Sequence, residues 1–126
     1  MQLTEQRFGN ALLLRITGRI DRDTADAFNA ALQPHLNNCK IGGEVLLLDF
    51  SGVQYMSSLG FQALLRAQQW AKKQSGSFAV AALQAGVKDV FNTANFAKLI
   101  RYYESVEKAL AEMSYSAYTA YTQASK

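Results

Sequence analysis

The alternation of hydrophobic and polar positions predicts that strands and helices follow one another along the chain. The opening stretch "LTEQRFGNALLLRITG" contains two strand-like runs around Gly9 and Asn10, which both tolerate the positive φ angles of a tight hairpin. The second run, residues 11–17, is almost continuously apolar, as expected for a strand covered on both faces. The chain is therefore expected to begin with a β-hairpin whose second strand is central.

Helical spacing follows in residues 21–38. Four apolar side chains recur at the spacing of one helix face: Ala25, Phe28, Leu32 and Leu36. Asp21 or Asp23 can cap the start of this helix, where a carboxylate also suits the helix dipole. Pro34 lacks a backbone donor and clashes with the carbonyl four residues earlier, so it predicts a kink or an early end.

The clearest strand pattern is "EVLLLDF", residues 44–50, which should be central and parallel to its neighbours. A helix over residues 59–71 follows, and Gly76 ends it. Four side chains of this helix are expected to point inward: Phe61, Leu64, Leu65 and Ala71.

The last third of the domain continues this alternation with shorter segments. Residues 77–83 and 99–103 are predicted strands, and residues 84–96 and 104–113 are predicted helices. The inward-facing residues of the two helices are Val87, Val90, Phe91 and Ala94 in the first and Val106, Ala109, Leu110 and Met113 in the second. The order β-β-α-β-α-β-α-β-α predicts an α/β fold, with a small mixed, mostly parallel β-sheet of about five strands and about four helices packed on it.

Residues 1–113 are predicted to form this domain, and residues 114–126 a polar C-terminal extension. The tail, "SYSAYTAYTQASK", is of low complexity, with a tyrosine at every third position from 115 to 121. A frayed extension is the first interpretation. The alternative is one or two helical turns that lay the tyrosines on a partner or on the body of the protein.

Composition and charge narrow the class of protein. Of the 126 residues, 49% are hydrophobic and 18% are charged, which suits one packed domain. The net charge of +3 is scattered without a run of five like charges, which argues against nucleic-acid binding. No basic segment followed by an apolar run opens the chain, and no stretch has the length of a membrane span. We therefore expect a cytoplasmic protein without direct membrane insertion.

The residues that usually carry catalysis or metal binding are sparse. A single cysteine, Cys39, allows no internal disulfide and suits a reducing compartment. His35 and Cys39 together fall short of the four ligands of a structural zinc site. Asp21, Asp49 and Asp89 are spread over three elements, and no set of nucleophile, base and orienting group is visible. The sequence predicts no cofactor, no metal and no enzymatic activity.

The joint between strand and helix in "VQYMSSLGFQALL", residues 53–65, carries the most informative chemistry. The first backbone N–H groups of a helix have no internal partners and attract anions, and Gly60 leaves room for a close approach. Ser57 or Ser58 can cap the helix through its side-chain oxygen, or can accept a phosphate group that the positive end of the helix tolerates. From the residue types alone, capping is the favoured interpretation.

Three stretches together resemble the STAS domain, the sulfate-transporter and anti-sigma-factor-antagonist family. "LLLDFSGVQYMSSLGFQALLRA" resembles the family's hydrophobic strand, its Ser-Gly turn and the Asp-Ser-Ser/Thr-Gly-Leu motif that opens a helix. "LRITGRIDRDTADAF" is similar to the family's first block, with Gly18 and Asp21 in its turn, and "RYYESVEKAL" to the closing strand and helix. The resemblance covers residues 2–113 and implies a small mixed sheet with helices on one side.

The resemblance also implies a function. Single-domain members of the family are anti-sigma factor antagonists, which bind an anti-sigma factor, usually a serine kinase of histidine-kinase-like ATPase type, in a partner-switching pathway that regulates transcription. Phosphorylation at the helix start breaks that complex, and a phosphatase restores it. By resemblance, eight residues form the partner-binding face: Gly18, Asp21, Ser57, Ser58, Leu59, Gly60, Gln62 and Arg66. A weak homodimer is considered as well.

This sequence departs from the family motif at the residue that usually accepts the phosphate. Aligned on Gly60, Ser57 replaces the motif's Asp, and Leu59 replaces the usual phosphoacceptor. Either Ser58, or less directly Ser57, is modified instead, or the protein binds its partner constitutively. Leu59 either anchors the partner or packs against Met56 or the loop. Asp21 either hydrogen-bonds a nearby serine hydroxyl or only caps its helix.

A second function would leave this turn unmodified. Some STAS proteins of this size bind and stabilise the ATPase of a lipid-transport ABC complex and need no phosphorylation site. The leucine at position 59 suits this alternative, and the neighbouring genes would distinguish the two functions.

Overall fold

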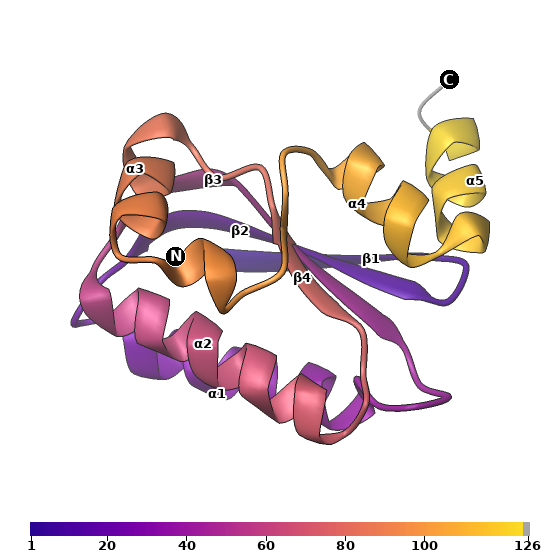
Figure 1. Ribbon diagram of the computed structural model, residues 1–126, viewed down its shortest axis with the longest axis horizontal. Coiled ribbons are helices and arrows are strands. Elements are labelled where there is room, and N and C mark those ends of the chain that lie inside the picture. Colours follow the sequence, from indigo (N-terminus) through magenta and orange to yellow (C-terminus); the bar gives the residue numbers. More distant parts are fainter. Residues whose placement is uncertain (125–126) are drawn as a thin grey trace.

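The computed structural model describes residues 1–124 and contains a five-stranded sheet in the order β1-β2-β3-β4-β5. The β1–β2 pair is antiparallel and the other three pairs are parallel, which confirms the predicted mixed, mostly parallel sheet. The strands are β1 (Gln2–Phe8), β2 (Ala11–Ile20), β3 (Val45–Met56), β4 (Phe78–Ala81) and β5 (Tyr102–Tyr103). The helices are α1 (Ala25–Asn38), α2 (Ser58–Lys73), α3 (Ala85–Thr93), the short 3₁₀ helix η1 (Phe96–Lys98), α4 (Val106–Met113) and α5 (Tyr115–Ala124) (Figure 1).

The predicted hairpin is confirmed. Phe8 pairs with Ala11, so Gly9 and Asn10 form the turn, and Gly9 has the positive φ of 55° that the sequence suggested. β2 then lies between β1 and β3, which explains its almost continuous apolar run.

Helices cover both faces of the sheet, which corrects the expectation of helices on one side only. Because neighbouring residues of a strand point to opposite faces, Leu12 and Leu14 of β2 pack in the cluster with α1, α2 and α3, whereas Ala11 and Leu13 pack in the cluster with α4 and α5. Right-handed crossovers between parallel strands place α1, α2 and α3 on the same face. The chain after β5 is free of that constraint and folds back over the opposite face (Figure 1).

The tail forms the helix α5, so the interpretation as a frayed extension is wrong. Ala117 is buried, the ring of Tyr121 meets the ring of Phe8 edge-on at 5.3 Å, and the Ser114 hydroxyl donates to the Asn10 side chain beside the hairpin turn. The alternative, in which helical turns lay tyrosines on the body, describes what is found. The predicted boundary at residue 113 falls between α4 and α5, which contact each other.

Two elements continue past a point at which the local pattern could have ended them. β3 extends beyond its apolar run to Met56, as the joint between strand and helix suggested, because its pairing with β2 resumes at Gly52 after an irregularity, and Gly52 lies directly against Thr17. α1 continues past Pro34 to Asn38. Pro34 and Ala30 are both exposed, so the Ala30 carbonyl that loses its partner can face water.

Other expectations about helix ends and faces are corrected. Thr24, not Asp21 or Asp23, occupies the N-cap position of α1. Val90 is 49% exposed, because α3 buries only Val87 and Phe91. α3 is also too short to bury Ala94, which follows its last residue and is exposed.

Candidate functional site

The two turns singled out in the sequence lie side by side at the C-terminal ends of β2 and β3. Ile20 pairs with Met56 in the sheet, and the Ser57 amide donates a hydrogen bond of 2.8 Å to the Ile20 carbonyl. The stretch from Gly18 to Asp21 and the stretch from Ser57 to Gly60 therefore form one surface, which we call the paired turns. Strand pairing over a separation of more than thirty residues creates this surface.

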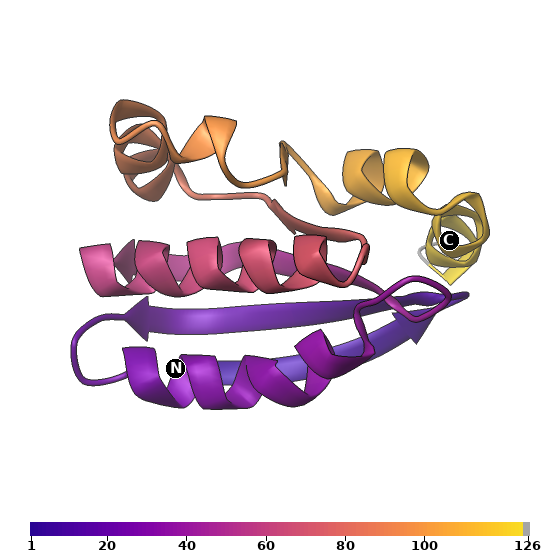
Figure 2. The same cartoon turned by 60° about the horizontal axis from the view of Figure 1, so that its bottom comes forward.

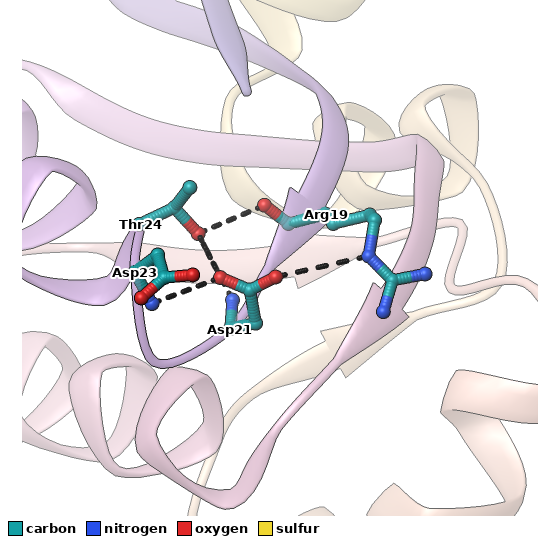
Figure 3. Close-up of polar contacts among 4 residues, drawn as sticks. All are labelled: Arg19, Asp21, Asp23 and Thr24. Carbon is teal, nitrogen blue, oxygen red and sulfur yellow. Dashed lines mark hydrogen bonds and ion pairs between the residues drawn. The ribbon is translucent and has the colours of Figure 1, made fainter.

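The first of the paired turns is held by the side chain of Asp21 (Figure 3). Its Oδ1 accepts a hydrogen bond of 3.0 Å from the Asp23 amide and lies 3.3 Å from the Thr24 hydroxyl. That hydroxyl accepts from the Asp21 amide and donates to the Arg19 carbonyl, both at 2.9 Å. The Arg19 guanidinium lies 3.7 Å from Asp21 Oδ2. Asp21 therefore binds neither a serine hydroxyl nor the helix start as an N-cap, and instead fixes the turn.

This hydrogen bonding changes the acidity of Asp21. Partial burial raises the pKa of its carboxyl, but the bonds from the Asp23 amide and from Thr24, together with the charge of Arg19, outweigh burial and leave the pKa below its ordinary value. Asp21 is consequently ionised at neutral pH and compensates the charge of Arg19.

The two serines of the second turn differ in accessibility. Ser57 occupies the N-cap position of α2, but its Oγ is buried and has no hydrogen-bond partner among the described residues. The favoured interpretation, a side-chain cap by a serine, is therefore wrong for Ser57. Ser58 is the first residue of α2 and is exposed. The hydroxyl that another molecule can reach belongs to Ser58.

Gly60 and Leu59 have opposite roles in the packing of this turn. A Cβ atom on Gly60 would lie 2.8 Å from Met56 Cγ and 2.9 Å from Ile20 Cγ2, so the glycine lets α2 approach the strand ends. Because Gly60 is buried against side chains, its missing Cβ makes room for packing and not for an anion. Leu59 keeps 41% of its surface exposed, beside the reachable hydroxyl of Ser58.

The outer side of α2 extends the surface away from the paired turns. Ser58, Gln62 and Arg66 are spaced four residues apart, so they lie on one side of the helix, and all three are exposed. Arg66 lines a groove between α1 and α2, together with Gln33 and Trp70. Of the predicted partner-binding residues, Arg66 is thus the farthest along the helix from the turns.

Sequence reasoning missed an exposed pair beside the turns. The Arg19 guanidinium lies 4.4 Å from the centre of the Tyr55 ring, and Tyr55 is 42% exposed. Tyr55 also lines a groove with Val87 and Val90 of α3. Only the register that pairs Arg19 with Tyr55 reveals this contact, and no local pattern encodes that register.

The other candidate residues do not assemble a catalytic or metal site. Asp49 is buried, but its carboxylate lies 3.6 Å from the Arg15 guanidinium and accepts from the Ser51 amide, so it is paired. In the described part of the chain, no three side chains of His, Cys, Asp or Glu gather where a metal ion could bind. The helices of residues 1–124 include none that is long and apolar enough to cross a membrane.

Comparison with known families identifies the family to which this chain belongs. The model of the family described as "Mlab, STAS domain" matches residues 3–101, which include both paired turns and most of the sheet. The chain therefore belongs to the STAS domain family, as the sequence motifs suggested.

Solved structures share the fold at low sequence identity. An anti-sigma factor antagonist from Mycobacterium paratuberculosis is 20% identical, with a TM-score of 0.79 over 89% of this chain and 92% of that one. An anti-sigma-factor antagonist (STAS) domain protein from Planctomyces limnophilus is 15% identical, with a TM-score of 0.76 over 89% and 97%. The Bacillus cell fate determinant SpoIIAA in its phosphorylated form is 13% identical, with a TM-score of 0.62 over 88% and 98%. At these identities the likeness shows a common fold.

Proposed function

We propose that this protein is a regulatory binding module of the anti-sigma factor antagonist type. Its partner is an anti-sigma factor that is also a serine kinase of the histidine-kinase-like ATPase class. The observation that carries the proposal is the surface of the paired turns, where Ser58 and Leu59 are exposed next to each other. Similar structures described as anti-sigma factor antagonists support it. The protein acts in the cytoplasm by binding, not by catalysis, and thereby regulates transcription.

Ser58 is the phosphoacceptor in this proposal. Its position at the first residue of α2 would place about two negative charges at the positive end of a helix dipole, where the fold tolerates them. The buried Oγ of Ser57 is a poor kinase substrate because the turn would have to open first. The solved phosphorylated form of SpoIIAA supports control by phosphate in a protein of this fold.

Leu59 is the anchor that the phosphate controls. An exposed leucine next to unpaired helix N–H groups can bury apolar area in a partner while those groups meet polar atoms. A phosphate on the neighbouring Ser58 would bring charge into that contact and oppose its desolvation. The alternative, a STAS subunit that binds the ATPase of a lipid-transport complex, would use the same leucine without a phosphate.

The test is capture of partners from the host's own lysate with the wild-type protein and the variants Ser58→Ala and Ser57→Ala. Mass spectrometry identifies the captured proteins and measures the intact mass of the bait. We expect a histidine-kinase-like ATPase and an added phosphate, which Ser58→Ala loses and Ser57→Ala keeps. Capture of a transporter ATPase by an unmodified bait would overturn the proposal in favour of the lipid-transport function. A phosphate that persists in Ser58→Ala would place the acceptor elsewhere.

A further inference from the structure

The end of the molecule opposite the paired turns carries a second exposed surface. It consists of Lys40 and Ile41 from the loop between α1 and β3, and of Trp70, Lys72 and Lys73 from the end of α2; we call it the basic tip. The loop and the helix end lie side by side in both views (Figures 1 and 2), and the Ile41 amide donates to the Gln74 carbonyl just after α2. Ile41 is 79% exposed and Trp70 is 45% exposed.

The loop of the basic tip is held in a defined shape. The Gly43 amide donates to the Lys40 carbonyl at 2.8 Å, which closes a four-residue turn with Ile41 and Gly42 at its corners. Gly42, the third residue of this turn, has a φ of +74°, which favours glycine, and a Cβ built there meets no atom within 4 Å. The Gln74 side chain donates to two carbonyls at the end of α1 at 2.8 and 3.0 Å. Ile41 is 79% exposed and therefore projects from the corner of a fixed turn.

The positive charge of the basic tip is not compensated. None of the ion pairs within residues 1–124 involves Lys40, Lys72 or Lys73. α2 contains no acidic residue, and the acid that follows the loop in sequence, Glu44, is bound to Arg7 at 2.9 Å. Exposed apolar side chains are thus surrounded by free lysines.

We propose that the basic tip docks on an anionic lipid surface. Each lysine near such a surface strengthens binding about fivefold, an isoleucine can enter the boundary between headgroups and acyl chains, and tryptophan favours that boundary. A protein partner would have to offer a pocket to the side chain that projects from this turn, whereas a fluid lipid interface adapts to it. The charge and the shape of the tip together therefore favour a membrane over an acidic protein.

Docking at the basic tip would leave the paired turns free. On α2, Trp70 follows Gly60 by ten residues, so the nearest parts of the two surfaces are about 15 Å apart along the helix axis. The paired turns would therefore lie at the end of the helix away from the lipid. The protein could then hold its partner close to a membrane. This docking goes beyond the proposed function and does not depend on it.

The experiment uses the full chain with vesicles of phosphatidylcholine, alone or mixed with phosphatidylserine. Co-sedimentation measures binding, and Trp70, the single tryptophan of the sequence, reports its own environment by fluorescence. We expect binding to the phosphatidylserine vesicles only, a shift of the emission to shorter wavelength, and loss of both when salt is added. Absence of binding, or equal binding to both vesicles, would overturn the proposal.

Variants locate the binding surface. Lys72→Glu combined with Lys73→Glu should weaken binding at least about 25-fold, and Ile41→Asp should remove the emission shift. Lys108→Glu reverses an exposed lysine on α4 and should bind like the wild type. Thermal melting followed by circular dichroism verifies that each variant is folded. If the double variant binds vesicles like the wild type, the basic tip is not the lipid-binding surface. If the protein binds soluble polyglutamate and does not bind vesicles, the ligand of the tip is an acidic polypeptide and the proposal is overturned.

Discussion

The two ends of α2 present apolar side chains in different electrostatic settings. At the N-terminal end, exposed Leu59 stands beside the first backbone N–H groups of α2, which have no partners within the helix, and the neighbouring Arg19 is compensated by Asp21. At the C-terminal end, Ile41 and Trp70 stand among lysines without ion-pair partners in residues 1–124. The helix dipole favours anions at the first end and cations at the second. The comparison shows how a single helix can offer surfaces to two partners of unlike chemistry.

The two ends also differ in how they are attached to the body. At the N-terminal end, Gly60 packs against the side chains of Met56 and Ile20. At the C-terminal end, a Cβ on Gly76 would clash with the Cys39 carbonyl oxygen, so there the contact is with backbone. A side chain can move aside more readily than a carbonyl that the Gln74 side chain already holds.

The largest expected effect is a loss of partner binding, which should follow a substitution in the paired turns and not one in the basic tip. Leu59→Asp places a charge in the centre of the proposed contact and should weaken binding of the captured partner at least about thirtyfold. Ile41→Asp makes the same change to an exposed apolar residue at the other end and should leave that affinity unchanged. Isothermal titration calorimetry with the purified partner measures both. Equal losses in the two variants would contradict the separation of the surfaces.

The attachment of the two ends can be compared by adding one methyl group to each. Gly76→Ala should lower the free energy of unfolding by about 3 kcal/mol, because the Cys39 carbonyl must move. Gly60→Ala should cost about 1 kcal/mol or less, since Met56 is flexible and alanine favours the helix. Gly86→Ala meets no atom within 4 Å and serves as a control that gains stability. Urea unfolding gives all three values, and a cost at Gly60 equal to that at Gly76 would show that the ends are held alike.

The two serine N-caps of α2 and α4 should respond differently to truncation. Ser105 accepts a hydrogen bond of 3.1 Å from the Lys108 amide, so Ser105→Ala should cost about 1 kcal/mol. Ser57 makes no cap bond and buries an unpartnered hydroxyl, so Ser57→Ala should cost nothing or stabilise the protein. A loss of about 1 kcal/mol in Ser57→Ala would reveal a cap bond at that position. Chemical denaturation of both variants measures these changes in the free energy of unfolding.

The smallest expected effect concerns acid sensitivity at the paired turns. Because the pKa of Asp21 is lower in the folded protein than its ordinary value, its ionised form stabilises the fold above that ordinary value. This contribution disappears as the pH falls through the lower pKa of the folded state. Asp21→Asn lacks it, so between neutral and acidic pH the variant should lose less stability than the wild type. Denaturant unfolding at a series of pH values measures the two slopes, and identical slopes would contradict the role of Asp21 in the turn.

Local sequence predicted the order of the elements well and their ends and caps less well. The two-residue hairpin at Gly9 and Asn10 was predicted because both residues tolerate positive φ angles, and of the two only Gly9 adopts one. Pro34 does not end α1 early, since the effect of a proline depends on whether the carbonyl four residues earlier faces water. The prediction that Val90 points inward was wrong, because helical periodicity identifies one face of a helix but not how much of that face a neighbouring element covers.

The sequence by itself determined the alternation of strands and helices, the hairpin, and the two motifs that meet in the paired turns. Tertiary structure alone decided that the Oγ of Ser57 is buried and that Ser58 is exposed, because the packing of Gly60 on Ile20 and Met56 sets the depth of the helix start. It also decided that α5 covers the second face of the sheet and that Ile41 meets the end of α2. These outcomes depend on contacts between segments far apart in the chain, and such contacts cannot be predicted from short-range periodicity.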